Sequence, residues 1–170
     1  MKPVLKMEVS NEGVIEFLNG ILGRTNEFAR HLDNQTNILI GLSSVIFTVA
    51  ITGLSNGNKN PALFILALSS GISAIASLLA IHPPKAMRKR GQEESLMYNK
   101  KISTHASSLD YLKQLENVIK SREEIVKQYA VEIYNLDRFY YRPKRKLFKV
   151  ARNILLFGLI FSLIFFIVSL

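Results

Sequence analysis

The chain has 170 residues, of which 48% are hydrophobic, and it carries a formal net charge of +9. Both figures hold only if apolar and charged residues occupy different stretches of the chain. The absence of cysteine excludes disulfide, iron–sulfur and zinc–thiolate chemistry.

Residues 1–36 predict a cytoplasmic amphipathic helix that leads into the membrane. Val14, Leu18, Phe28 and Leu32 lie roughly on one face of this helix, and charged residues lie around the rest of it. We expect the helix to continue into the apolar run that follows. We do not expect the first apolar run to be a secretory signal peptide, because this charged segment precedes it and no A-x-A-like cleavage site follows it.

Residues 37–54 and 62–82 predict a hairpin of two transmembrane helices. The runs ILIGLSSVIFTVAITGL (38–54) and ALFILALSSGISAIASLLAI (62–81) hold no charged residue. A bilayer core of about 30 Å requires roughly 20 helical residues, so each run is long enough to cross it. The link between them, SNGNKNP, is rich in turn-forming residues.

The middle of the chain, residues 83–149, is expected to be a cytoplasmic helical region. Apolar residues at spacings of three and four predict two helices, about 104–120 and 122–141. Ser121 and Glu124 fit a capping box that would begin the second helix. Residues 86–103 are expected to form a loop, and residues 150–170 predict a third transmembrane helix. The predicted fold class is therefore an all-α membrane protein, with three transmembrane helices and a cytoplasmic helical hairpin between the second and third.

Basic residues set the predicted orientation. Most of the 22 Lys and Arg lie between residues 83 and 152 and cluster at both membrane edges. By the positive-inside rule, the N-terminus and residues 83–149 are cytoplasmic and the chain ends on the far side of the membrane. Contact with the membrane surface accounts for this charge. A nucleic-acid partner is not expected, since no stacking aromatics alternate with the basic residues.

Catalytic signals are weak throughout. His31, His82 and His105 lie far apart, and none has a second histidine at the spacing of a helical metal site. The G-x-S-x-G, H-E-x-x-H and glycine-rich phosphate-loop motifs are missing. We therefore expect neither an enzyme nor a metal or cofactor site.

Small residues inside the apolar runs predict close helix packing. Such residues let helix backbones approach one another in lipid, where the hydrophobic effect does not drive association. Packing inside one protomer and packing between protomers both remain open, and the second would give a homo-oligomer. The predicted packing residues are Gly41, Gly71, Ala74, Gly158 and Ser162.

Three stretches resemble the Pycsar transmembrane effector family. They are DNQTNILIGLS (33–43), HPPK (82–85) and EEIVKQYAVEIYNLDRFYYRPKRKLFKVARNILLFGLIF (123–161), and the resemblance extends over residues 14–170. It identifies Asp33, Asn34 and Gln35 as a membrane-entry motif. It implies an antiphage effector in the bacterial inner membrane. Such an effector impairs membrane integrity on sensing a cyclic pyrimidine mononucleotide, cUMP or cCMP. The implied partners are the lipid bilayer, this second messenger and further copies of the chain.

Two hypotheses follow for the cytoplasmic helices. In a ligand-gated effector they would hold the nucleotide phosphate, and Arg138, Arg142 and Lys144 are the candidates because they lie where these helices meet the third span. The same cations could instead be anchors that snorkel to the membrane surface. In the alternative hypothesis the chain is a non-gated membrane scaffold or oligomerisation protein. A holin is a weaker third possibility, since the charge here lies between spans and not in a terminal tail.

Overall fold

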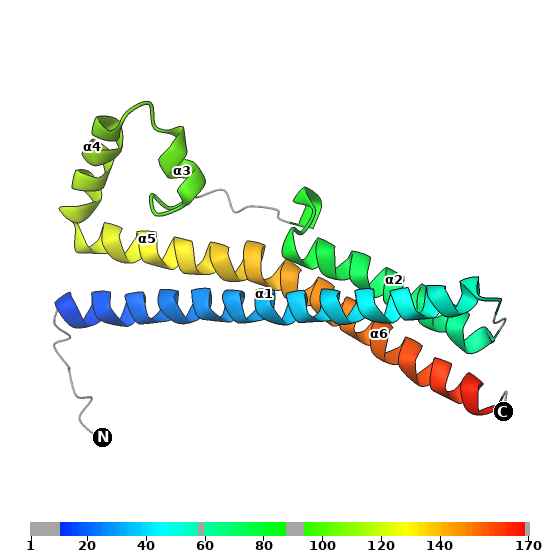
Figure 1. Cartoon of the computed structure of the whole chain (residues 1–170). Helices are drawn as coiled ribbons and strands as arrows, with labels where there is room; N and C mark the ends of the chain where they lie inside the picture. The colour runs from blue at the N-terminus through cyan, green and yellow to red at the C-terminus, as the bar shows by residue number, and fades with distance from the viewer. Residues whose placement is uncertain (1–10, 58–59, 88–93, 169–170) are drawn as a thin grey trace, which may run out of the picture. The chain divides into compact units, whose positions relative to one another are not determined.

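The computed structural model describes residues 11–57, 60–87 and 94–168, and every regular element in these ranges is helical (Figure 1). The all-α class predicted from the sequence is therefore confirmed for the described residues. In chain order the elements are α1 (Asn11–Ser55), α2 (Pro61–Ile81), the 3₁₀ turn η1 (Lys85–Met87), α3 (Asn99–Thr104), α4 (Ser108–Ile119), α5 (Arg122–Asn135), the π-helical turn η2 (Leu136–Tyr141) and α6 (Arg142–Val168).

Three helical stretches are long and apolar enough to cross a membrane, as predicted. They are Glu12–Ser55, Pro61–Ile81 and Arg122–Val168, and their most apolar windows have mean hydropathies of 2.1, 2.2 and 2.3. The first is much longer than a bilayer core, since the 45 residues of α1 extend over about 68 Å at 1.5 Å per residue. The predicted entry helix and the predicted first span are thus one continuous helix.

The chain divides into two compact units, each described here by itself. The membrane unit comprises the described residues within 29–89 and 139–170 and contains α2, α6 and most of the apolar part of α1. The hairpin unit comprises the described residues within 1–28 and 90–138 and contains α3, α4 and α5. Among the described residues the chain passes from one unit to the other inside α1 and inside η2, and the remaining crossing, between residues 89 and 90, lies outside them.

In the hairpin unit, serine caps define where the helices begin. Ser107 Oγ accepts a hydrogen bond from Asp110 N (3.2 Å) at the start of α4, and Ser121 Oγ accepts one from Glu124 N (3.4 Å) at the start of α5. These bonds satisfy amides that have no partner inside the helix. The predicted break at Ser121 is confirmed. The expected loop over 86–103 is only partly right, because most of η1 and most of α3 fall within it. Residues 88–93 lie outside the described ranges.

The turn between α1 and α2 shows why one helix ends and the next begins here. Gly57 has a φ of +84°, a left-handed conformation that favours glycine, just after α1 ends. Asn60 Oδ1 then accepts a hydrogen bond from Ala62 N (2.8 Å), with Pro61 in the first helical position of α2. A proline there sacrifices no helical hydrogen bond.

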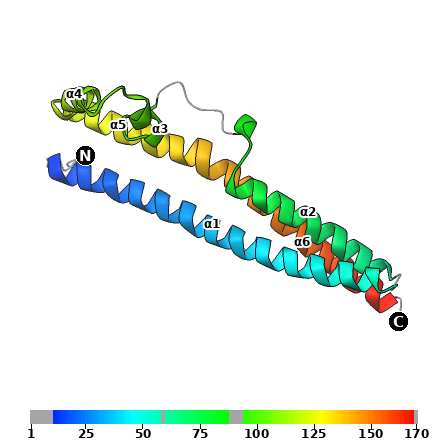
Figure 2. The ribbon, with the colours of Figure 1, turned by 45° about the horizontal axis from the view of Figure 1, so that its top comes forward.

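Small residues hold the membrane unit together. In both ribbon views α2 and α6 run side by side (Figure 2), and a Cβ added at Gly158 would lie 2.2 Å from Ser69 Cβ. Ser162 Oγ donates a hydrogen bond across the same contact to the Ala62 carbonyl (3.0 Å). Large apolar side chains instead cover the outward faces of the helices, where lipid suits them.

We predict that Gly158→Ala destabilises the membrane unit by about 1–3 kcal/mol through overpacking. The new Cβ would lie 1.9 Å from Ser69 Oγ, whereas the Cα at residue 69 is 3.7 Å away, an ordinary contact. Adding Ser69→Gly should therefore restore most of the thermal stability in detergent. Gly41→Ala is the matched control, because a Cβ there would meet nothing within 4 Å. Equal losses with and without Ser69→Gly would contradict this account.

Candidate functional site

The base of the membrane unit contains a buried cation. The side chain of Lys144 is 3% exposed, and its Nζ donates hydrogen bonds to Asp33 Oδ1 (2.7 Å), Asp33 Oδ2 (2.9 Å) and Tyr140 Oη (2.9 Å). The ammonium also lies 4.2 Å from the centroid of the Tyr140 ring. Since an ammonium has three donor hydrogens, these contacts satisfy it fully. We call Asp33, Tyr140 and Lys144 the lysine latch.

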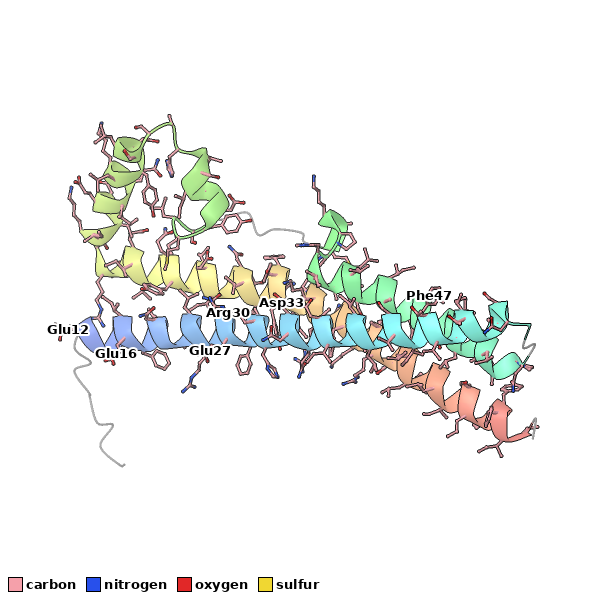
Figure 3. The ribbon with its side chains drawn as sticks, in the orientation of Figure 1. Glu12, Glu16, Glu27, Arg30, Asp33 and Phe47 are labelled. Atoms are coloured by element: carbon pink, nitrogen blue, oxygen red, sulfur yellow. The ribbon has the colours of Figure 1, made fainter. Side chains whose placement is uncertain are left out.

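Each member of the latch comes from a different element. Asp33 lies on α1 (Figure 3), Tyr140 lies in η2 and Lys144 lies in the first turn of α6. On α6, Lys144 precedes Ala151 and Gly158 by seven and fourteen residues, so it shares their buried face. A lysine at such a position requires a carboxylate partner, and Asp33 supplies it from 111 residues away in the chain.

The π-helical turn contains the latch residue Tyr140, and it has a cause in the sequence. Pro143 lacks an N–H, and a proline ring within a helix displaces the carbonyl four residues earlier. The wider turn at Leu136–Tyr141 lies directly before this proline, which is itself buried in the membrane unit. Pro143 lies in the first turn of α6. Sequence reasoning did not find the π-helical turn, and such turns are frequent at functional sites.

The three predicted phosphate-binding cations have different surroundings. Lys144 is engaged in the latch, whereas Arg138 and Arg142 are exposed. Arg138, in the hairpin unit, places its guanidinium carbon 5.7 Å from the centroid of the Tyr134 ring. What the structure does bring together is Lys144 and Asp33, one residue from the cationic set and one from the membrane-entry motif.

The other residues of the membrane-entry motif lie apart from the latch. Asn34 and Gln35 are exposed, and Gln35 Nε2 lies 3.0 Å from His31 Nε2, one turn earlier on α1. The family resemblance grouped the three residues as one motif, but successive helical residues point in different directions.

The predicted packing residues differ in their surroundings. Gly158 and Ser162 are buried between α6 and α2, as described above. Gly71 lies close to α1, since a Cβ there would be 3.2 Å from Phe47 Cε2 (Phe47 is labelled in Figure 3). Ala74 is half-buried, and Gly41 is exposed with open space around it.

Ser73 connects all three helices of the membrane unit. Its Oγ donates to the Ala151 carbonyl of α6 (3.0 Å) and lies 3.0 Å from Ser43 Oγ of α1. A hydroxyl has one hydrogen, so Ser43 must be the donor in the second bond. All three residues are fully buried. Sequence reasoning singled out neither Ser43 nor Ser73, and no motif indicated this three-way contact.

A second polar cluster lies in the hairpin unit. Ser95 Oγ donates to the buried Glu132 carboxylate, while Leu96 N donates to Gln128 Oε1 (2.7 Å) and Tyr111 Oη donates to the Leu96 carbonyl (3.3 Å). These bonds attach the segment before α3 to both α4 and α5. The sequence gives little sign of this cluster, because its members are scattered in the chain.

His105 completes the hairpin unit's polar interior. Its side chain is 8% exposed, its Nδ1 lies 3.0 Å from Asp110 Oδ2, and its ring packs against Tyr111. Its Nε2 is buried and has no hydrogen-bond partner among the described residues. Within those residues, no three His, Cys, Asp or Glu side chains are grouped so that they could hold a metal ion.

The latch predicts an asymmetric response to mutation. Asp33→Leu should destabilise the protein strongly, because it leaves the buried Lys144 ammonium without its carboxylate. Lys144→Met should cost less, since the Asp33 side chain is 35% exposed and can be hydrated. The double variant should be more stable than Asp33→Leu alone. Thermal denaturation in detergent measures all three, with Lys146→Met as the control at an exposed position. Additive losses in the double variant would rule out the coupling.

Comparison with known proteins shows the family to which this chain belongs. Neither the search of curated proteins nor that of solved structures finds a match. A family model described as the Pycsar effector protein domain matches residues 17–169. This range includes α2, α6, all of α1 beyond its first six residues and every member of the latch. The chain therefore belongs to the Pycsar effector family.

Proposed function

We propose that this chain impairs the integrity of the bacterial inner membrane when its hairpin unit binds a cyclic pyrimidine mononucleotide, cUMP or cCMP. Membership of the Pycsar effector family already makes it a membrane effector of antiphage defence. The observation that best supports gating is the lysine latch. This buried ion pair lies at the base of the apolar helices, directly after the turn where the chain leaves the hairpin unit.

In this proposal the latch holds the resting state. A buried pair with complete hydrogen bonding is stable while its geometry is kept, and it becomes unfavourable once one partner moves away. Tyr140 belongs to η2, so a change in the π-helical turn would move one of the three oxygen atoms that accept hydrogen bonds from Lys144. A ligand can shift such an equilibrium only by its differential affinity for the two states.

The hairpin unit is the proposed sensor. Its buried His105 Nε2, without a partner among the described residues, is a group that a ligand could satisfy. Arg138 and Arg142 remain our candidates for contact with the nucleotide phosphate, each by itself, because both are exposed and guanidinium groups bind phosphate well. Lys144 is reassigned in this proposal from ligand contact to latch.

The proposed topology places both predicted sensing arginines on the cytoplasmic side. A reporter fused near Ser107 should be active in the cytoplasm, and one fused after residue 170 should be active only outside it. Matched fusions in a bacterial inner membrane test this, with expression of each fusion measured by immunoblot as the control. Cytoplasmic activity at both positions would contradict a three-span arrangement.

Potassium efflux from liposomes tests gating directly. Wild-type protein should release trapped potassium on addition of cUMP or cCMP and retain it otherwise, while Lys144→Met should leak without nucleotide. Arg138→Ala and Arg142→Ala should each weaken the nucleotide response, with Arg145→Ala as the neighbouring exposed control. Protease protection of the reconstituted chain would confirm correct insertion.

Two outcomes would count against the proposal. Equal efflux with and without nucleotide would indicate an ungated pore former. No efflux from correctly inserted protein in any condition would favour a non-gated scaffold or oligomerisation protein.

A further inference from the structure

The interior of the membrane unit is lined by hydroxyl groups. Six Ser and Thr side chains from all three long helices are at least nine-tenths buried there, while the outward faces carry large apolar residues. This distribution is the reverse of that in a soluble bundle. We call the set the hydroxyl seam; its members are Thr36, Ser43, Ser70, Ser73, Ser77 and Ser162.

Five of these hydroxyls have hydrogen-bond partners. Thr36 donates to the Leu32 carbonyl (2.7 Å) and Ser70 to the Leu66 carbonyl (2.6 Å), each within its own helix. Ser43, Ser73 and Ser162 bond across helices, as described above. Nearly every donor in the seam is therefore satisfied in this packing.

Ser77 is the exception. Its residue is 0% exposed, and its Oγ has no hydrogen-bond partner among the described residues. Most buried hydroxyls have a hydrogen-bond partner. Inside a membrane, a hydroxyl without a protein partner cannot form a hydrogen bond to bulk water instead. Ser77 lies one helical turn beyond Ser73 on α2, on the same buried face. The Ser77 hydroxyl is thus an unpartnered oxygen on the same buried face of α2 as the hydrogen-bonded hydroxyls of Ser70 and Ser73.

In the described state the seam is closed. The contact of Ser43, Ser73 and the Ala151 carbonyl joins all three helices at one level, and Gly158 lies against Ser69 at another. Three helices in such contact leave no room for a file of water. The seam can become wet only if α1 moves away from α2 and α6.

We propose that the hydroxyl seam lines the route by which water and small cations cross the membrane when the effector is active. This inference rests on the proposed function and adds the location of the leak. Hydroxyl and carbonyl oxygens can replace part of the hydration shell of a small cation, as the lining of ion channels does. The lysine latch adjoins one end of the seam, since Asp33 precedes Thr36 by less than one turn of α1. Release of the latch frees α1 at that end.

The outer face of α1 is the competing route. Ser44 and Thr48 are exposed there, at a shallow hollow that they share with Val45 and Val49. The Thr48 hydroxyl, however, donates to the Ser44 carbonyl (3.0 Å) in its own helix. Both residues are exposed, whereas Ser77 is buried between helices. Leakage along protomer contacts on this face would leave the seam dry.

Single cysteines distinguish the two routes cleanly, because the natural chain has none. We would place Cys at Ser77 in the seam, at Leu78 as an outward-facing control of equal depth, and at Ser44 on the outer face of α1. Each variant is reconstituted in liposomes, both in the wild-type background with cUMP or cCMP and in the Lys144→Met background without nucleotide. The probe is a membrane-impermeant, negatively charged methanethiosulfonate. It reacts with thiolates, which form in water and not in lipid.

We expect Ser77→Cys to react at least about tenfold faster in the leaking state than in the resting state, because a wetted thiol ionises. The adduct should also slow potassium efflux by occupying the route. Leu78→Cys should react slowly in both states. If Ser77→Cys fails to insert, Ser70→Cys tests the same face of α2.

The outcomes separate this inference from the proposed function. Efflux with slow modification at the seam would overturn the inference and leave the effector function standing, and fast modification only at Ser44→Cys would locate the leak on the outer face of α1. Efflux that persists unchanged after complete modification of Ser77→Cys would also overturn it. No efflux in any condition, from correctly inserted protein, would overturn both.

Discussion

The ammonium of Lys144 must keep three hydrogen-bond acceptors inside a unit whose surface is apolar, and this requirement constrains the arrangement of the helices. Two acceptors are Asp33 oxygens on α1 and the third is the Tyr140 hydroxyl in η2. A slip of α1 by one turn would carry Asp33 about 5.4 Å away and leave a buried charge unpaired. Contacts between small side chains tolerate such a slip far better. The Asp33–Lys144 pair therefore sets the axial position of α1, and the other contacts of the interface pack around that position.

The Tyr140 acceptor lies in the turn of helix inside which the chain leaves the hairpin unit. Tyr140 and Lys144 are four residues apart, with Pro143 between them and the π-helical turn reaching to Tyr141. π-Helical geometry is rare in proteins and occurs mostly as single turns inside α-helices, often at functional sites. The π-helical turn η2, inside the long Arg122–Val168 helix, thus provides one of the three oxygen acceptors of the buried Lys144 ammonium. Under the proposed function, a change in this turn would disturb the latch.

The sequence predicted the fold well wherever the physics is local. Runs of about 20 uncharged residues indicate spans because a bilayer requires that length, and Ser121 marks a helix start because its hydroxyl reaches an amide three residues on. Gly158 and Ser162 were predicted to pack, although their partners on α2 could not be named. The orientation and the cytoplasmic location of the hairpin remain predictions.

The candidate site was harder to predict because its contacts are not local. Asp33 and Lys144 were both singled out, but in different sets, and nothing in a single sequence indicates which residues meet across 111 positions. The seven-residue spacing of Lys144, Ala151 and Gly158 was a usable signal, since it places the lysine on a buried face. The π-helical turn, the role of Ser73 and the polar interior of the hairpin unit depend on tertiary contacts that spacing does not reveal.

The serines between the helices have a further consequence for how easily this bundle can change its packing. Each such hydroxyl has a carbonyl three or four residues back on its own helix, the kind of acceptor that Thr48, Thr52 and Ser70 already use. When two helices part, Ser73 or Ser162 can rotate to that acceptor, so the number of hydrogen bonds is conserved. Interhelical hydrogen bonds of this type contribute only about 0.6 kcal/mol each on average. A protein held together in this way can exchange neighbours in lipid at small cost, whereas one held by interlocking bulky side chains would have to break its packing first.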